Sequence, residues 1–182
     1  MSNLAYMPRY TYEDYKLWEG DWELIDGYPV AMAPSPFGPH QAIMSKIVFQ
    51  LEQAFEKCEN PKSRCIVYAE LDYVIDEHTV VRPDVMVSCK KIIDFARTAP
   101  KFIAEITSPS TAQKDERVKF ELYEREGVEW YMIVSPELKK VRLFWLEGRK
   151  YQKAGEAIDG EIKLTIEGCE IVFMVDRFWE VL

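Results

Sequence analysis

Residues 82–87 read Arg-Pro-Asp-Val-Met-Val, and residues 102–108 read Phe-Ile-Ala-Glu-Ile-Thr-Ser. Both stretches are apolar enough to be strands, and each carries a single carboxylate, Asp84 in the first and Glu105 in the second. A carboxylate loses hydration in such a run, and packing alone does not require it. Mg²⁺ is commonly held by one or two carboxylates together with substrate phosphates. The pair therefore predicts a metal site suited to phosphodiester chemistry, with Asp84 and Glu105 as ligands.

Pro83, which precedes Asp84, affects the direction in which that carboxylate points. Proline cannot donate a ladder hydrogen bond, so Pro83 marks an edge strand, the start of a strand or a bulge. A bulge would turn Asp84 out of the regular pleat. An edge or a strand end would instead leave either acid harmlessly solvated, and this alternative stays open.

The rest of the pattern predicts helices and strands. Thr11 and Asp14 are typical of a helix start, Asp26-Gly27 of a two-residue hairpin turn and Gly127 of a helix end. The expected elements are a helix at 11–19, a hairpin at 22–32, a long helix from 40 to about 59, strands between 65 and 87 and at 101–107, a helix at 112–126 after a capping box from Ser110 to Gln113, and short strands between 129 and 175. We expect residues 1–182 to form one domain with one site.

Length and composition are those of a globular protein. The chain has 182 residues, of which 48% are apolar and 30% are charged, and this differs from the composition of disordered chains. No apolar run approaches the roughly 20 residues that span a bilayer, and the N-terminus has no secretory signal. We therefore expect a cytoplasmic protein with no membrane contact.

Cysteine, histidine and net charge narrow the class of site. The cysteines at 58, 65, 89 and 169 form no C-x-x-C pair and are expected to be reduced thiols. Only two histidines are present, which favours an all-oxygen site over zinc. The net charge of −8 excludes a general nucleic-acid coat protein, because such proteins neutralise phosphates with Lys and Arg. Binding to DNA without a metal ion is expected to be weak.

Lys119 lies on a helical stripe after the second acid. The stripe contains Asp115, Val118, Lys119, Leu122 and Tyr123. An ammonium on this face, directed at two carboxylates and a phosphate, would orient water and offset charge in the transition state. The alternative is a surface pair between Asp115 and Lys119, worth about 0.2–0.5 kcal/mol.

Several motifs of this chain occur together in one known family. They are Arg-Pro-Asp at 82–84, Glu-Ile-Thr-Ser-Pro-Ser-Thr at 105–111, Asp-Glu-Arg-Val-Lys at 115–119, Tyr123, Gly-Val-Glu-Trp-Tyr at 127–131, Trp-Glu-Leu-Ile-Asp-Gly at 22–27 and His40. In this combination the chain resembles the Uma-type family of putative restriction endonucleases, which is assigned to the PD-(D/E)XK nuclease superfamily. The resemblance implies an α/β, restriction-endonuclease-like core with a central mixed β-sheet flanked by helices, an N-terminal hairpin and a C-terminal β meander. It also implies Mg²⁺ dependence, with Mn²⁺ as a substitute, and DNA as the substrate.

The superfamily motif is broken at one position. The pattern has lysine two residues after the acid, where this chain has Thr107. The resemblance suggests that Lys119 has taken over that role, in agreement with the helical stripe. Glu23 is a further candidate acid, because it alternates with Trp22 and Leu24, and a solvated hairpin carboxylate is the alternative. His40 could contact phosphate or act as a base, but at the start of a helix a capping or packing role is expected.

These observations favour a Mg²⁺-dependent endonuclease that uses Asp84, Glu105, Lys119 and Glu23. The rival is a catalytically silent nuclease-fold module that binds DNA or a protein partner, supported by Thr107 and by the acidic net charge. A homodimer is expected if both strands of a duplex are cut, because a two-fold axis relates antiparallel strands. A third possibility is a structural homodimer assembled through the aromatic residues Phe173, Phe178 and Trp179.

Overall fold

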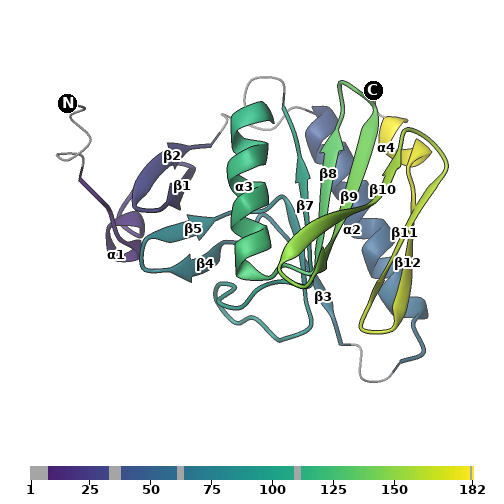
Figure 1. Cartoon of the computed structure of the whole chain (residues 1–182), viewed down its shortest axis with the longest axis horizontal. Coiled ribbons are helices and arrows are strands. Elements are labelled where there is room, and N and C mark those ends of the chain that lie inside the picture. The colour runs from purple at the N-terminus through teal and green to yellow at the C-terminus, as the bar shows by residue number, and fades with distance from the viewer. Residues whose placement is uncertain (1–7, 33–37, 61–63, 109–111, 181) are drawn as a thin grey trace.

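The computed structural model describes residues 8–32, 38–60, 64–108, 112–180 and 182, with the side chains of 112–116 excepted (Figure 1). Among the helices of these segments, none is both long and apolar enough to cross a membrane. The elements in chain order are α1 (Tyr12–Tyr15), β1 (Trp22–Ile25), β2 (Tyr28–Ala31), α2 (Gly38–Lys57), β3 (Ile66–Ala69), β4 (Tyr73–Asp76), β5 (Thr79–Val81), β6 (Val85–Ser88), β7 (Phe102–Ile106), α3 (Ala112–Glu126), β8 (Trp130–Ser135), β9 (Lys140–Glu147), β10 (Lys150–Ala157), β11 (Glu161–Ile166), β12 (Cys169–Met174) and α4 (Asp176–Trp179).

The described strands form a mixed α/β architecture, as predicted. The central sheet has six strands in the order β10-β9-β8-β7-β6-β3, and the N-terminal hairpin belongs to a separate sheet in the order β2-β1-β5-β4. Strands β7 and β8 are parallel, and the other pairs in the central sheet are antiparallel. A parallel pair needs a long crossover, and α3 provides it. Of the expected C-terminal meander, β8, β9 and β10 extend the central sheet, whereas β11 and β12 pair only with each other.

The Arg-Pro-Asp segment is the link between the two larger sheets. Strand β5 ends at Val81 in the hairpin sheet, and β6 begins at Val85 in the central sheet. Because Pro83 has no N–H, the ladder stops at this point. The expectation of a strand start after Pro83 is confirmed. A bulge within one continuous strand is not what forms.

Local signals placed the turns and helix ends well. Asp26 and Gly27 have positive φ angles of 50° and 83°, as the hairpin turn requires. Thr11 and Asp14 form a reciprocal capping box, although α1 ends earlier than predicted, at Tyr15. Helix α3 ends before Gly127, which has a φ of 83°. The capping box expected from Ser110 to Gln113 lies outside the described residues.

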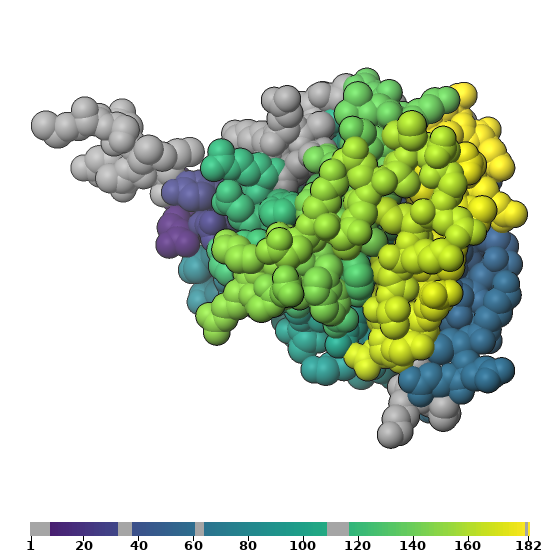
Figure 2. Space-filling model, turned by 45° about the vertical axis from the view of Figure 1, so that its right-hand side comes forward, coloured from purple at the N-terminus to yellow at the C-terminus, as the bar shows by residue number. Residues whose placement is uncertain are grey.

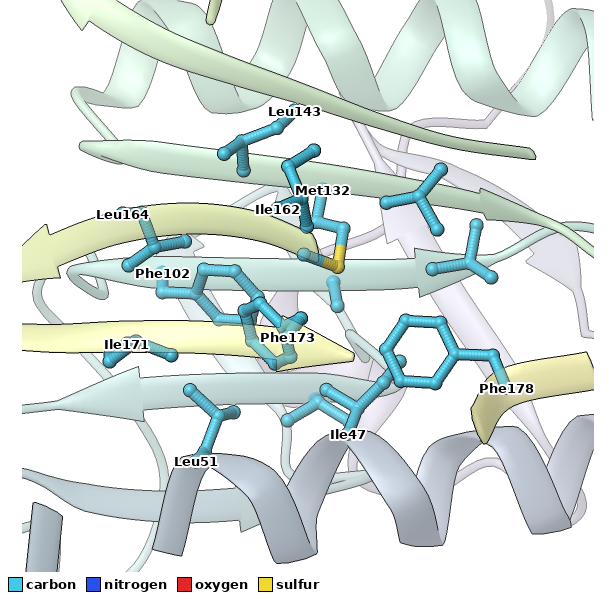
Figure 3. Packing of buried hydrophobic residues seen from close by; sticks show 14 of the residues in the cluster. Ile47, Leu51, Phe102, Met132, Leu143, Ile162, Leu164, Ile171, Phe173 and Phe178 are labelled. Carbon is cyan, nitrogen blue, oxygen red and sulfur yellow. The ribbon is translucent and has the colours of Figure 1, made fainter. Parts of the chain in front are cut away.

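One face of the central sheet is covered by α2, α4 and the β11–β12 pair. Figure 3 shows Phe102, Phe173 and Phe178 packed between the strands and Ile47 of α2. In Figure 2 the yellow C-terminal strands lie between the green strands and the blue helix α2. Phe173 and Phe178 are fully buried within this core. The proposed structural homodimer through the aromatic C-terminus is therefore wrong, because two of its three anchors already pack inside the chain.

The cysteines are paired, so the expectation of reduced thiols is wrong. Cys58 is bonded to Cys169, with Cα atoms 5.5 Å apart, and Cys65 is bonded to Cys89, with Cα atoms 3.9 Å apart. The first bond joins the end of α2 to the start of β12. The second extends the β3–β6 ladder by one step, since Ile66 pairs with Ser88. Wide spacing in the sequence concealed both pairs, because the fold brings the residues together.

Candidate active site

The register of β6 and β7 places the two predicted acids side by side. The strands are antiparallel, and the last pair of their ladder is Val85 with Ala104. Asp84 directly precedes β6 and Glu105 directly follows Ala104 in β7, so the two acids lie at this end of the ladder. Like charges at neighbouring positions of a sheet are destabilising, so this arrangement needs a reason beyond packing.

Glu105 points from β7 toward α3, away from the apolar face. Its Oε1 accepts a hydrogen bond of 2.7 Å from the Tyr123 hydroxyl and one of 3.0 Å from Lys119 Nζ. The side chains of Glu105 and Lys119 are each only 12% exposed. Both partners come from α3, on residues one turn apart. Strand β7 is also interior to the sheet, so an edge does not solvate this acid.

Lys119 joins Glu105 to a second carboxylate, Glu23. Lys119 Nζ lies 2.8 Å from Glu23 Oε1, and the Glu23 side chain is 6% exposed. The alternative of a solvated hairpin carboxylate is therefore wrong. Glu23 Oε1 also accepts a 2.8 Å hydrogen bond from the backbone N–H of Arg82. The side chain of Asp115 is outside the described residues, so the proposed surface pair with Lys119 is not described.

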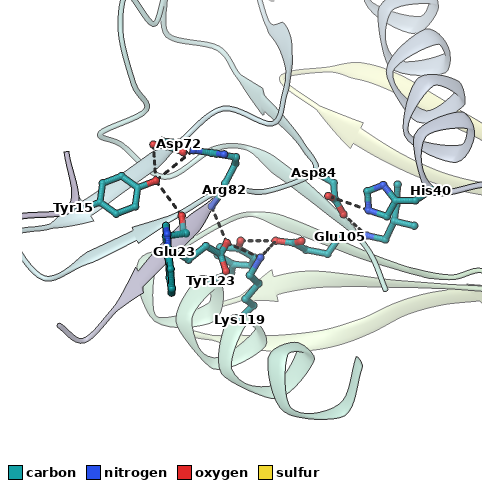
Figure 4. A network of polar contacts seen from close by, with 11 residues as sticks. Tyr15, Glu23, His40, Asp72, Arg82, Asp84, Glu105, Lys119 and Tyr123 are labelled. Atoms are coloured by element: carbon teal, nitrogen blue, oxygen red, sulfur yellow. Dashed lines mark hydrogen bonds and ion pairs between the residues drawn. The ribbon is translucent and has the colours of Figure 1, made fainter. Parts of the chain in front are cut away.

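Asp84 lies at the other end of the cluster, beside α2 (Figure 4). Its Oδ2 accepts a 2.6 Å hydrogen bond from the backbone N–H of Ile106, and its Oδ1 lies 3.2 Å from His40 Nε2. Two partners on different elements thus fix the direction of this carboxylate. His40 faces an acid of the site, whereas a capping or packing role was expected. Its Nδ1 is buried and has no hydrogen-bond partner among the described residues.

The burial of so many charges changes their protonation. Burial raises the pKa of Glu105 to about 7, and repulsion by Asp84 and Glu23 acts in the same direction, against the attraction of Lys119. Burial alone would lower the pKa of Lys119, but Glu105 and Glu23 raise it above its ordinary value. Burial and the same two acids raise the pKa of Tyr123. The lysine is therefore an ammonium, and the site carries more negative charge than it neutralises.

Arg82 connects this cluster to the hairpin sheet (Figure 4). Its Nε donates a 2.7 Å hydrogen bond to Asp72, its Nη1 lies 2.9 Å from Asp21, and its Nη2 contacts the Tyr15 hydroxyl at 3.5 Å. Burial lowers the pKa of Arg82, but the contacts with Asp72, Tyr15 and Asp21 together raise it above its ordinary value. The guanidinium thus anchors the backbone whose N–H holds Glu23 and which leads directly to Asp84.

The donor set suits a hard divalent cation. Asp84 and Glu105 offer carboxylate oxygens at neighbouring positions, and a cation would offset both the burial of Glu105 and its repulsion by Asp84 and Glu23. Within the described residues, no group of three or more His, Cys, Asp or Glu side chains is assembled to hold a metal by itself. Two protein carboxylates, with water and substrate phosphate completing the shell, are the usual arrangement for Mg²⁺.

Comparison with known proteins places this geometry in a family. The family model described as Uma2, putative restriction endonuclease, matches residues 12–166. The chain belongs to this family. A solved structure from Anabaena variabilis ATCC 29413, titled as a putative nuclease belonging to DUF820, is similar with a TM-score of 0.73 and 16% identity, covering 93% of this chain and 97% of that one. At this identity the likeness establishes the shared fold. A comparison with curated proteins gave no match.

The structure brings most of the predicted site residues together. The structure brings Glu23, Glu105 and Lys119 into contact, and it places Asp84 next to them. Sequence reasoning had left Tyr123 as one member of a stripe, although its position four residues after Lys119 places both on one helical face. Thr107 does not approach the cluster: its hydroxyl contacts the Val134 carbonyl and the Ser135 hydroxyl, both at 3.4 Å.

Proposed function

We propose that this Uma2 protein is a metal-dependent endonuclease that hydrolyses DNA phosphodiester bonds, with Asp84 and Glu105 holding Mg²⁺ or Mn²⁺. The observation that carries the proposal is the register of β6 and β7. It brings the carboxylate that directly precedes β6 to the end of the ladder that holds Glu105 of β7, and a buried ammonium lies against Glu105. Burying like charges together costs stability. Buried groups with such perturbed pKa values cluster at functional sites.

Each residue has a distinct task in this proposal. The cation, when bound, would polarise the phosphate and favour ionisation of an attacking water. Lys119 offers its ammonium to the charge that develops on the phosphate in the transition state. Glu23 and Tyr123 hold Lys119 and Glu105 in place. His40 and the Ile106 N–H fix the direction of Asp84.

DNA fits this site as a substrate only with help from the cation. The chain has a net charge of −8, and phosphate contacts by Lys and Arg are the main source of affinity in most DNA-binding proteins. A bound divalent cation places positive charge where the phosphate would lie. We therefore expect binding that depends strongly on the metal ion. Cleavage of both strands of a duplex would be explained by a homodimer.

The second candidate is a nuclease-fold module without catalysis. It is favoured by Thr107, which occupies the place of the motif lysine and directs its hydroxyl toward β8. It is also favoured by the engagement of Glu105 Oε1 with both Lys119 and Tyr123. Such a module would bind DNA or a protein partner through the same face.

Plasmid nicking separates the two candidates. Supercoiled plasmid is incubated with Mg²⁺ or Mn²⁺ and the wild type, Asp84→Asn or Lys119→Ala. Asp159→Asn, at an exposed position between β10 and β11, is the matched control. We expect nicking by the wild type and by Asp159→Asn, and its loss in the two site variants and in EDTA. Nicking that survives both site substitutions would identify a contaminant, and its absence from the wild type would favour the silent module.

A further inference from the structure

A cavity of about 220 Å³ lies beside the N-terminal hairpin, across Arg82 from the carboxylate cluster. Its lining includes the aromatic side chains of Tyr12, Tyr15, Trp18 and Trp22, together with Asp72 and Arg82. We call it the aromatic cavity. Arg82 belongs to both regions, because its guanidinium lines the cavity while its backbone N–H binds Glu23. The cavity and the site are thus joined by a single residue.

The rings of the aromatic cavity meet at steep angles. The Tyr15 and Trp18 rings have centroids 5.6 Å apart and are inclined at 67°, and those of Trp18 and Trp22 are 6.0 Å apart and inclined at 69°. Trp22 is fixed, because its Nε1 donates a 2.8 Å hydrogen bond to the Glu19 carbonyl. All three rings are only partly buried. They form inclined walls around the cavity and do not stack closely on one another.

The polar side of the aromatic cavity offers donors more readily than acceptors. The two carboxylate oxygens of Asp72 are engaged, one by Arg82 and the other by the Tyr15 hydroxyl at 3.0 Å. A guanidinium has five N–H bonds, and the contacts of Arg82 with Asp72, Asp21 and Tyr15 use one each from Nε, Nη1 and Nη2. The remaining donors suit the ring nitrogen or carbonyl oxygen of a flat heterocycle.

Size and charge point to the same class of ligand. The cavity is smaller than the roughly 300–1,000 Å³ of sites for drug-sized molecules, so it admits a single ring system. Lys16 and Arg97 lie 5.2 and 5.5 Å from the Tyr12 ring centroid. Each of these cations also pairs with an exposed carboxylate, Glu13 and Asp94 respectively, and an anionic backbone next to the ring would compete with these exposed pairs. An isolated organic cation is disfavoured, because the carboxylate of Asp72 is already neutralised by Arg82.

We propose that the aromatic cavity binds one unpaired base of the nucleic-acid strand whose phosphate lies at the carboxylate cluster. This inference rests on the proposed function and extends it, because it makes strands with an accessible base the preferred substrate. Stacking on aromatic side chains accepts any base, so the cavity would favour unpaired or frayed positions without specifying sequence.

Abasic scanning tests the proposal. Binding of a short oligothymidylate is measured by tryptophan fluorescence and by anisotropy, with Ca²⁺ in place of Mg²⁺ to prevent cleavage. A single abasic position is moved along the oligonucleotide. The variants are Trp18→Leu, Phe95→Ser at a second lining position, and Leu17→Ser as the control, whose side chain is 82% exposed and does not line the cavity.

We expect Trp18→Leu to weaken binding by roughly 5- to 150-fold, the range for losing one stacked base. At one abasic position, the wild type should lose about as much affinity as Trp18→Leu loses for the intact oligonucleotide. Trp18→Leu with that abasic oligonucleotide should bind only slightly more weakly than either change alone, as for groups that act together. Phe95→Ser should follow the same pattern if Trp18→Leu fails to fold. Leu17→Ser should bind like the wild type.

Either of two results would overturn the proposal. The first is unchanged affinity in both lining variants when they are folded. The second is that, at every abasic position, the free-energy loss from the abasic site simply adds to the loss from the protein variant. The outcome is separable from that of the proposed function. Coupling without nicking activity would keep the base site and reject the nuclease. Nicking without coupling would do the reverse.

Discussion

The two faces of the central sheet are built from the same strands for different purposes. On one face, alternate residues of β7, Phe102, Ala104 and Ile106, join the apolar core under α2. On the other face, Glu105 lies between them in the sequence and meets Lys119 and Tyr123 of α3. Apolar burial stabilises both faces, because Ile103 and Tyr131 are fully buried on the α3 face as well. The charges of Glu105 and Lys119 are set within that second core, where their burial costs free energy. The difference separates a face that is apolar throughout from one that also carries the charged cluster.

The largest expected effect comes from Glu105→Gln on the charged face. The amide keeps an acceptor for Tyr123 and Lys119 but no longer offers an anionic ligand, so we expect kcat/KM for nicking to fall by at least about 1,000-fold. Urea unfolding in EDTA should give a free energy equal to or above that of the wild type. If Glu105→Gln lost stability but kept its nicking activity, Glu105 would be a structural residue and not a catalytic one.

On the apolar face, Phe102→Ala should do the opposite. Removing this fully buried ring leaves a cavity beside Phe173, and such changes cost about 3–5 kcal/mol of the free energy of unfolding. Residual nicking by the folded fraction should match the wild type. Ile93→Ser, at a side chain that is 91% exposed, should change stability by less than about 0.5 kcal/mol. If Phe102→Ala lowered the free energy of unfolding by less than Ile93→Ser does, the packing of this core would not be a main source of stability.

The disulfides sharpen the comparison further. Cys58–Cys169 closes a separation of 111 residues and ties α2 to β12 on the apolar face, whereas Cys65–Cys89 closes one of 24 residues at the sheet edge. Loop-closure entropy predicts a loss of about 4.8 kcal/mol for the double Ala variant of the first pair and about 3.4 kcal/mol for the second. Denaturant unfolding under non-reducing conditions measures both. Equal losses, or unchanged stability on reduction, would contradict this order.

A smaller effect should appear in the pH dependence of the metal-free protein. The pKa of Glu105 rises from 4.5 to about 7 on folding, so the folded state holds more protons in that window. Stability from this group is present below pH 4.5 and is lost as the pH rises toward 7. In EDTA, the wild type should therefore lose stability relative to Glu105→Gln between these values. Parallel curves for the two proteins would contradict a protonated Glu105.

Sequence reasoning located the parts of the site that local rules govern. Asp84, Glu105 and Lys119 stood out because a carboxylate in an apolar strand and a cation on a partly apolar helical stripe are unusual. The side-by-side placement of the acids depends on the pairing of β6 with β7, and that register is set by the whole sheet. The same applies to the contact between His40 and Asp84, to the burial of Glu23 and to the disulfides.

Some fold features were equally beyond local signals. The alternating pattern around Pro83 is typical of one strand. In the structure, the part before Pro83 is β5 of the hairpin sheet and the part after it is β6 of the central sheet. The aromatic residues near 173–178 were apolar enough for an interface, yet the core under α2 uses them. In both cases the choice depends on tertiary packing, which a window of sequence does not contain.

The central claim is that Asp84 and Glu105 bind one divalent cation together, and a crystal soaked in Mn²⁺ tests it most directly. We predict an anomalous peak about 2.1 Å from one oxygen of each carboxylate, absent from a crystal of Asp84→Asn soaked in the same way. No peak between these two side chains, or a peak held by other residues, would contradict the account.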